Sequence, residues 1–314
     1  MANYLITGGA GFIGSHLAEA LVLEGHSVRI FDNFRTGRRG NLAGIRGKAE
    51  IVKGDVRDRR ALRAAMRGVD YVLHQAALVS VAESVEHPEE TMDVNVNGTL
   101  NVLQAARISK VRRVVTASSC AVYGAGAVPA RESQAPMPLS PYAVSKLAAE
   151  TLCISFYYSY GLPATCLRYF NVFGPRQDPH SPYSGVIAIF SSRMVTGKPV
   201  TIYGDGRQTR DFVFVADIVR ANLAAAMSEQ AAGRVVNVGT GRGRSLLELR
   251  SELVSLRAAP LAVQYAPARP GDIYHSRSDP SLAKRLIGFQ ARTDFRSGLA
   301  STLQWQQSES GGAA

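Results

Sequence analysis

Short apolar segments alternate with helical segments throughout the first half of this chain. The apolar segments have the composition of buried strands, and the segments between them have the period of helices. The expected strands cover residues 4–7, 27–31, 50–53, 71–74, 113–117 and 164–169, and the expected helices cover 12–24, 59–66, 88–108 and 141–160. This alternation is typical of right-handed β-α-β units, so we predict an α/β fold with a doubly wound parallel sheet.

The pattern changes after Tyr169, which marks a second and smaller lobe. Prolines interrupt the chain there, and short strands near residues 200–203 and 235–238 alternate with scattered helices. The predicted units are residues 1–170 for a dinucleotide-binding domain, 171–314 mainly for a C-terminal substrate-binding lobe, and 211–238 for a segment that packs back on the sheet.

Composition excludes several classes of protein. The chain has 314 residues, 46% of them hydrophobic, which is enough for a sizeable buried core. No apolar run approaches the length of about 18 residues that spans a membrane, and no basic, apolar leader precedes the first strand. The three cysteines lack metal-ligand spacing and fit a reducing compartment. We expect a cytoplasmic protein with no metal and no membrane segment, and a disordered tail over residues 308–314.

The net charge of +11 is compatible with nucleic acid, a membrane surface or anionic small substrates as partners. The basic residues are dispersed, however, and the densest runs, at residues 35–39 and 57–67, lack interleaved aromatic residues. Nucleic-acid sites normally concentrate their positive charge on one face, so we predict no nucleic-acid partner.

A glycine-rich turn, Thr7-Gly-Gly-Ala-Gly-Phe-Ile-Gly14, follows the first expected strand and opens the first expected helix. Glycine permits a tight turn and lets the backbone approach a pyrophosphate, which the amides of the helix N-terminus then receive. The residues expected to contact a dinucleotide here are Gly8, Gly11, Phe12, Ile13 and Gly14.

Two acidic positions follow the next strands. Asp32 stands 18 residues after Gly14, beside Asn33, where a carboxylate accepts hydrogen bonds from the adenosine ribose and repels a 2′-phosphate. NAD is therefore favoured over NADP, although the nearby Arg35 keeps NADP open. Asp55 and Val56 follow the third strand, where the adenine would lie; a helix cap is the alternative role for Asp55.

Tyr142 precedes Lys146 by four residues, so both side chains lie on one helix face. An ammonium close to a phenol favours the phenolate and makes the tyrosine a base. An ordinary amphipathic helix face is the alternative for this pair taken alone. Ser119, at the end of the fifth strand, supplies a third reactive hydroxyl.

Several motifs occur in a fixed order: TGGAGFIG, the acid at Asp32, GDVRD, HQAA, NVNGT, SSCAVYG, SPYAVSK and RYFNVFGPRQ. With them the chain resembles the extended short-chain dehydrogenase/reductase family, and within it the nucleotide-sugar 4-epimerases. The resemblance extends to about residue 305. It implies the Rossmann fold, NAD as cofactor, and a UDP-sugar as substrate. It also implies a homodimer, in which the helices 88–108 and 141–160 form a four-helix bundle with the same helices of a second copy.

The resemblance assigns roles to individual residues. Tyr142 corresponds to the catalytic base, Lys146 to the residue that lowers its pKa and binds the nicotinamide ribose, and Ser119 to the hydroxyl that contacts the reacting sugar oxygen. The further residues implied to line the cofactor are Ala76, Ala77, Asn95 and Tyr169. The residues implied to hold the uridine nucleotide are Asn171, Arg210, Arg269 and Asp272.

The implied reaction is 4-epimerisation of a UDP-hexose through a transient 4-keto sugar. The nearest alternative is a nucleotide-sugar dehydratase or another 4-keto-forming oxidoreductase of the family, but Ala121 occupies the position of the dehydratase glutamate. Cys120 beside it is expected to fill space, with an acid role as the alternative. Ser276 stands where some epimerases carry a tyrosine, and its small side chain implies room for a 2-acetamido group; an ordinary loop serine is the alternative.

Two other classes stay open at this point. One is an NAD-binding protein without catalysis, and the other is an oxidoreductase that releases an oxidised or reduced sugar.

Overall fold

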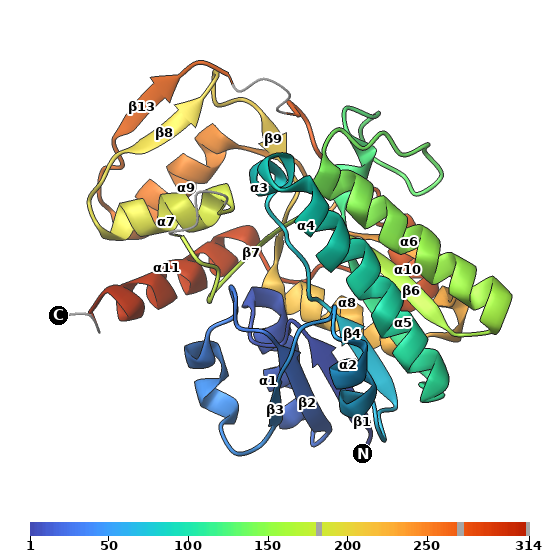
Figure 1. The fold of residues 1–314 in the computed structure, drawn as a ribbon. Coiled ribbons are helices and arrows are strands. Elements are labelled where there is room, and N and C mark those ends of the chain that lie inside the picture. Colours follow the sequence, from blue (N-terminus) through green and yellow to red (C-terminus); the bar gives the residue numbers. More distant parts are fainter. Residues whose placement is uncertain (180–183, 269–272, 312–314) are drawn as a thin grey trace.

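The computed structural model describes residues 1–179, 184–268 and 273–311. Its centre is a seven-stranded sheet in the order β11-β6-β5-β4-β1-β2-β3, in which each neighbouring pair is parallel (Figure 1). The strands are β1 Asn3–Thr7, β2 Ser27–Asp32, β3 Glu50–Lys53, β4 Tyr71–His74, β5 Arg113–Ser119, β6 Ala164–Tyr169 and β11 Arg234–Val238. The predicted doubly wound parallel sheet is confirmed.

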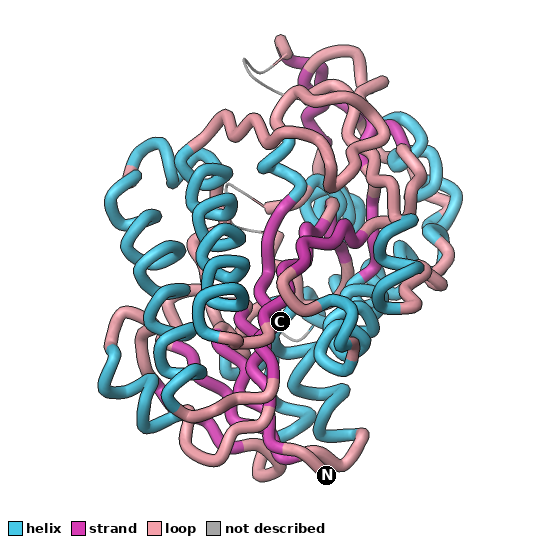
Figure 2. The backbone as a smooth tube through the Cα atoms, turned by 90° about the vertical axis from the view of Figure 1, so that its right-hand side faces the viewer, coloured by secondary structure: helices cyan, strands magenta, loops and turns pink. Residues whose placement is uncertain are grey.

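Helices cover both faces of this sheet (Figures 1 and 2). One face packs on α1 (Phe12–Leu23), α8 (Val215–Met227) and α10 (Ser281–Ile287), whose apolar side chains share one buried cluster with the sheet. The other face packs on α2 (Arg59–Ala65), α5 (Gly98–Ile108) and α6 (Pro141–Tyr160). Both faces of the strands are therefore apolar, as parallel sheets require.

The helix expected over residues 88–108 is not a regular α-helix. The structure has α4 at Pro88–Met92, a π-helical turn at Asp93–Asn97, and then α5. Such wide turns are common near functional sites. The loop before α4 also contains a short helix that the sequence pattern did not indicate, α3 at Val81–Glu86.

The second lobe is built from short strand pairs and three helices around a separate apolar cluster (Figure 1). The strand pairs are β7 (Asn171–Phe173) with β10 (Phe212–Phe214), β8 (Val200–Tyr203) with β13 (Val263–Ala266), and β9 (Thr209–Arg210) with β12 (Arg244–Ser245). The helices are α7 Val186–Val195, α9 Leu246–Arg257 and α11 Phe295–Gly311. α8 and β11 lie against the main sheet and at its edge, which supports our proposal that residues 211–238 belong with the first domain.

The expectation of a disordered tail from residue 308 is wrong for the described residues, because α11 continues to Gly311. Ser308 and Ser310 donate their hydroxyls to the carbonyls of Trp305 and Gln306, so these small polar residues bond to the helix backbone. Within the described ranges, none of the helices combines the length and the apolar character needed to cross a membrane.

Candidate active site

The glycine turn between β1 and α1 has no space for larger side chains. Gly8 has a φ of +68°, and a Cβ there would lie 2.7 Å from the amide nitrogen of Ala76. A Cβ on Gly14 would collide with the carbonyl oxygen of Gly8. β1, β4 and α1 therefore meet with backbone against backbone, as the predicted dinucleotide site requires.

The N-terminus of α1 lies at this turn. Gly11 precedes the helix, and Phe12 and Ile13 form its first turn. No side chain caps these amides within the described part of the chain, and no acidic residue occupies the first turn. The amides and the helix dipole thus suit an anionic group such as a pyrophosphate.

Asp32 ends β2 beside the glycine turn and is buried. Its carboxylate accepts the backbone amides of Ala10, at 2.9 Å, and Phe34, at 2.8 Å. These bonds join the glycine turn to the loop after β2. The structure thus brings Asp32 next to the turn, as the spacing predicts.

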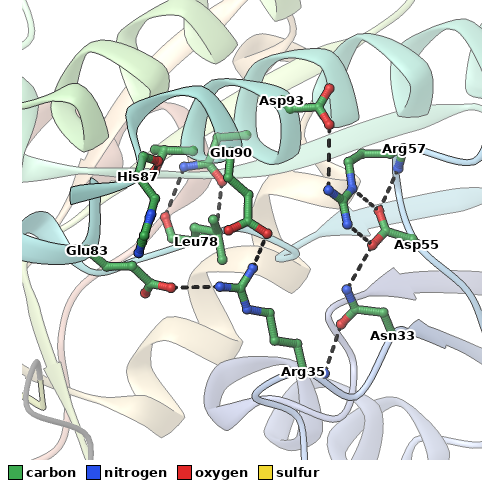
Figure 3. Close-up of polar contacts among 11 residues, drawn as sticks. Asn33, Arg35, Asp55, Arg57, Leu78, Glu83, His87, Glu90 and Asp93 are labelled. Atoms are coloured by element: carbon green, nitrogen blue, oxygen red, sulfur yellow. Dashed lines mark hydrogen bonds and ion pairs between the residues drawn. The ribbon is translucent and has the colours of Figure 1, made fainter. Parts of the chain in front are cut away.

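A series of polar contacts connects the carboxyl ends of β2 and β3 with the π-helical turn after α4 (Figure 3). Asn33 Nδ2 donates to Asp55 Oδ2 at 3.0 Å, and Arg57 donates to both oxygens of Asp55 at 2.9 and 2.8 Å. Arg57 Nη1 also lies 3.6 Å from Asp93 Oδ2. The hydrogen bonds from Arg57 hold the pKa of Asp55 well below its usual range. Asp55 is therefore an ionised, oriented acceptor at the predicted adenine position.

The alternative that Asp55 caps α2 is wrong. Asp58 is the cap and accepts the amides of Arg60 and Ala61 at 2.9 and 3.0 Å. Val56 is buried beside Asp55, and its carbonyl oxygen accepts from Asn101 Nδ2 at 3.1 Å.

Asn95 lies in the π-helical turn, and its side chain is fully buried. Its amide bonds to both backbone groups of Leu78, at 2.8 and 2.9 Å, and donates to Ser145 Oγ at 2.9 Å. Asn95 thus fixes the segment that follows Ala76 and Ala77 against α6. The π-helical turn has a physical role, because it aims this amide inward.

Tyr142 and Lys146 lie in the first turns of α6 and are both buried. Lys146 Nζ lies 5.9 Å from the centre of the Tyr142 ring and donates to the carbonyl of Ala117 on β5 at 3.0 Å. Ser119, at the end of β5, forms a hydrogen bond with the Tyr142 phenol. The three residues predicted to be catalytic are therefore brought together.

The electrostatics of this group differ from the expectation for a lysine-activated tyrosine. Burial raises the pKa of Tyr142 to about 12, although the hydrogen bond with Ser119 opposes this shift. Burial also lowers the pKa of Lys146 to about 8. The net shift of the phenol pKa is upward because desolvation outweighs the hydrogen bond with Ser119, so the expected lowering is wrong for the protein by itself.

Tyr169 lies at the end of β6, and its hydroxyl bonds to Asn222 Oδ1 at 2.9 Å and to Gln75 Nε2 at 3.2 Å. Burial raises its pKa to about 12, so the phenol stays neutral. The sequence pattern had no signal for these two partners, which come from distant segments.

Among the predicted substrate residues, Ser276 reaches the neighbourhood of the catalytic group from the second lobe. Ser276 N donates to the carbonyl of Thr209 at 3.1 Å, next to Arg210 on β9. Ser276 also forms a side-chain hydrogen bond with Cys120, the neighbour of Ser119. Burial raises the pKa of Cys120 to about 11, which leaves a neutral thiol and supports its space-filling role.

Asn171 begins β7, and its Oδ1 is buried with no hydrogen-bond partner among the described residues. Buried acceptors are nearly always satisfied, so this atom is available to a ligand. Two predicted substrate residues, Arg269 and Asp272, lie outside the described residues.

Sequence reasoning missed a buried ion pair beneath the catalytic residues. Arg168 donates to both oxygens of Glu150 at 2.8 and 2.7 Å, and Ser118 Oγ donates to the same carboxylate at 2.5 Å. Glu150 lies four residues after Lys146 on the same face of α6. That spacing, with a charged residue inside an apolar strand, was the available signal. The pair joins α6, β5 and β6 immediately behind the reacting groups.

Comparison with known proteins agrees with this geometry. The profile of the family described as "NAD dependent epimerase/dehydratase family" matches residues 4–239. The chain belongs to this family.

Proteins similar to this member of the NAD-dependent epimerase/dehydratase family act on several UDP-sugars. A UDP-glucose 4-epimerase from Mycolicibacterium smegmatis is 38% identical over 98% of this chain and 99% of its own. A solved UDP-N-acetylglucosamine 4-epimerase from Methanobrevibacter ruminantium is 39% identical with a TM-score of 0.94, over 98% of this chain and 99% of its own. A UDP-N-acetyl-alpha-D-glucosaminuronate decarboxylase from Bacillus cytotoxicus is 36% identical over 96% of both chains.

The residues present fit the NAD that the epimerase/dehydratase family uses. The crowded glycine turn and the uncapped α1 N-terminus suit a pyrophosphate, and Asp32 suits an unphosphorylated ribose. Which of the predicted residues contact NAD, and which contact the sugar nucleotide, remains a prediction.

Proposed function

We propose that this protein is a UDP-hexose 4-epimerase, which inverts the configuration of sugar carbon 4. The observation that carries the proposal is the convergence of Ser119, Tyr142 and Lys146 at the sheet edge that also carries the glycine turn of the NAD site. An NAD-binding protein without catalysis would not need a buried phenol hydrogen-bonded to a serine, with a buried ammonium 5.9 Å from the centre of the phenol ring.

Tyr142 acts as the base and then as the acid. Its phenolate takes the proton of the sugar 4-hydroxyl, and Ser119 holds the same sugar oxygen through its hydroxyl. NAD, when bound, supplies the nicotinamide that accepts the hydride of carbon 4 and returns it. The C–H and O–H bonds are replaced by a carbonyl, so a 4-keto sugar forms with no other reactant. After the keto sugar rotates to present its opposite face, Tyr142 returns the proton to the sugar 4-oxygen. The opposite configuration at carbon 4 results.

The buried surroundings make the ionisation of Tyr142 the demanding step. Lys146 holds most of its charge at neutral pH, because its lowered pKa of about 8 is still above 7. Its ammonium and the Ser119 hydroxyl are the groups of this chain that favour the phenolate.

Turning the sugar requires a firm hold on the nucleotide and a loose pocket around the hexose. We assign the nucleotide to Asn171, Arg210, Arg269 and Asp272, because arginine forks bind a diphosphate bidentately. The buried, unpartnered Oδ1 of Asn171 supports this assignment. Binding energy concentrated on the nucleotide leaves the sugar free to present either face.

The contact between Ser276 and Cys120 supports a pocket that accepts 2-acetamido sugars. It brings a small side chain into the neighbourhood of Ser119, where the sugar must lie. We therefore propose UDP-N-acetylglucosamine and UDP-N-acetylgalactosamine as substrates, together with UDP-glucose and UDP-galactose. The similar UDP-N-acetylglucosamine 4-epimerase from Methanobrevibacter ruminantium supports this choice.

A second candidate is another 4-keto-forming reaction of the family. The similar decarboxylase from Bacillus cytotoxicus favours loss of carbon dioxide from a UDP-uronic acid as this alternative. Dehydration is disfavoured, because Ala121 follows Cys120 where a dehydratase needs a carboxylate.

We also propose a homodimer and a cytoplasmic location. Exposed apolar and aromatic side chains lie on α5 and α6, namely Ile108, Val144, Tyr158 and Tyr160, which supports the four-helix bundle. All three cysteines are free, which supports a reducing compartment.

The test is a panel of UDP-sugars followed by proton NMR. We expect 4-epimers from UDP-N-acetylglucosamine and UDP-glucose, and no net change in the redox state of the cofactor. Tyr142→Phe should reduce turnover by about 10²- to 10⁴-fold and leave the dinucleotide bound. A panel without any 4-epimer contradicts the proposal, and carbon dioxide from a UDP-uronic acid supports the alternative.

A further inference from the structure

Arg35 lies close to the position where a second phosphate on the cofactor would be. It stands three residues after Asp32. Phe34 N bonds to the Asp32 carboxylate at 2.8 Å, and Arg35 N donates to Asn33 Oδ1 at 3.0 Å. The backbone of Arg35 is therefore held beside the predicted ribose site. An arginine in this region is what accommodates the 2′-phosphate in NADP-binding proteins of this fold.

The side chain of Arg35 is directed to two carboxylates instead (Figure 3). Nη2 donates to Glu83 on α3 at 2.9 Å, and Nη1 donates to Glu90 on α4. Both terminal nitrogens of the guanidinium are thus used. A bidentate bond to phosphate needs two guanidinium nitrogens, at least one of them terminal, so Arg35 can bind a 2′-phosphate in this way only by sharing or leaving at least one of its glutamates.

The local bonding of Glu83 indicates that its contact with Arg35 is preferred. Ser80 caps α3 by accepting the amide of Glu83, which is the first half of a capping box. At the start of α9 the same spacing gives the complete box, because Glu248 turns back to the amide of Ser245. Glu83 is in the equivalent position, but its carboxylate reaches across to Arg35.

The other arginines of this loop are also engaged. Arg38 Nη2 lies 2.5 Å from Asp178, and the Arg39 guanidinium lies over the ring of Phe34, 4.7 Å from its centre. The loop is strongly basic in sequence, yet its charges are directed to partners within the protein. A 2′-phosphate beside Asp32 would thus meet a carboxylate. Each of the three arginines of the loop, Arg35, Arg38 and Arg39, already has a partner within the protein.

We propose that Glu83 and Glu90 determine the cofactor preference of this chain by withholding Arg35 from the 2′ position of the adenosine ribose. NAD binds because the ribose hydroxyls need no cation, whereas NADP loses the one arginine best placed to neutralise its additional phosphate. The inference rests on the proposed placement of the ribose beside Asp32. The inference assigns a role in cofactor selection to Glu83 and Glu90, in addition to that of Asp32 at the end of β2.

The experiment is equilibrium dialysis of the purified protein against an equimolar mixture of NAD and NADP, with the bound dinucleotides quantified by chromatography. In Glu83→Gln/Glu90→Gln the bound ratio of NADP to NAD should rise about 5-fold or more over the unmodified protein at low salt. The rise should disappear when Arg35→Gln is added. It should also shrink in about 1 M salt, where charges are screened within about 3 Å.

The matched control is Glu50→Gln/Glu252→Gln, which removes two carboxylates from other partly exposed pairs, with Arg29 and Arg296. An equal rise in the control, or one that persists with Arg35→Gln, overturns the inference. Asp32→Asn separates the two proposals. If it raises the NADP ratio and Glu83→Gln/Glu90→Gln does not, the ribose placement stands and this inference fails. If Asp32→Asn has no effect, the placement itself is contradicted.

Discussion

Two arginines of this protein each bind carboxylates through two guanidinium nitrogens, in opposite surroundings. Arg168 and Glu150 keep only 4% and 3% of their side-chain surface exposed, beneath the catalytic residues. Arg35 is 40% exposed, and its partners Glu83 and Glu90 are 25% and 35% exposed, at the edge of the proposed cofactor site. Both arginines make charge-assisted hydrogen bonds to carboxylates, but Arg168 is shielded from solvent and Arg35 is exposed to it.

The difference separates two tasks. A buried pair has lost its water and cannot exchange partners cheaply, so Glu150 and Arg168 hold α6, β5 and β6 in one arrangement behind Tyr142. An exposed pair gains little energy and can be replaced by water or by another anion. The side chain of Arg35 can therefore exchange its partners, which suits a residue that selects between related ligands.

The largest effect is expected where the buried pair is broken. Glu150→Gln leaves Arg168 buried without its counter-charge and should reduce the free energy of unfolding by about 3–5 kcal/mol. Urea denaturation measures this loss. The control is Glu252→Gln, which breaks an exposed pair with Arg296 and should cost less than about 1 kcal/mol. Equal losses in the two variants would show that burial does not distinguish the regions.

A smaller effect, dependent on pH, is expected from His74. This residue lies between the hydroxyls of Thr7 and Thr99, and burial lowers its pKa to about 3. The unfolded chain binds a proton below about pH 6.5 and the folded chain does not, so stability falls as the pH falls from 6.5 toward 3.

The contribution of His74 should approach 1.4 kcal/mol for each pH unit within that range, or about 2 kcal/mol between pH 6.5 and 5. Thermal or urea unfolding at several pH values measures this slope, and His74→Gln should flatten it relative to the unmodified protein. If the slope is unchanged in the variant, His74 does not titrate differently in the folded state.

The smallest effect on stability is expected from Arg35→Gln. Loss of two partly exposed ion pairs should change the free energy of unfolding by about 1 kcal/mol or less. The change should nearly vanish in about 1 M salt, whereas the loss in Glu150→Gln should persist there. Parallel urea titrations at low and high salt measure both. A salt-independent loss in Arg35→Gln would show that the contacts of Arg35 with Glu83 and Glu90 support the structure as the buried pair does.

Much of the architecture was predictable because strands and helices are encoded by local patterns. The strands at residues 50–53, 71–74 and 164–169 have the predicted limits, and α6 begins and ends as predicted, with Ser140 capping it ahead of Pro141. The grouping of Tyr142, Lys146 and Ser119 also followed, because parallel strands place their carboxyl ends at one edge of the sheet.

The partners of these residues were not predictable from spacing. Arg35 meets Glu83 and Glu90 across 48 and 55 positions of the sequence, and Ser276 comes to Cys120 from the other lobe. Nothing in the local pattern distinguishes these contacts from ordinary surface charges or a loop serine. They depend on how the loops after separate strands are folded over one another.

The sequence by itself determined the order of strands and helices, the glycine turn, the acid after β2, and the spacing of tyrosine and lysine on one helix face. Each is a short-range property, set by backbone conformation and side-chain period. Only the tertiary structure decided which arginine is buried with a carboxylate and which is tethered at the surface. It also decided that desolvation raises the pKa of Tyr142 to about 12. Burial and charge pairing depend on segments far apart in the chain, so they exist only once the sheet has assembled.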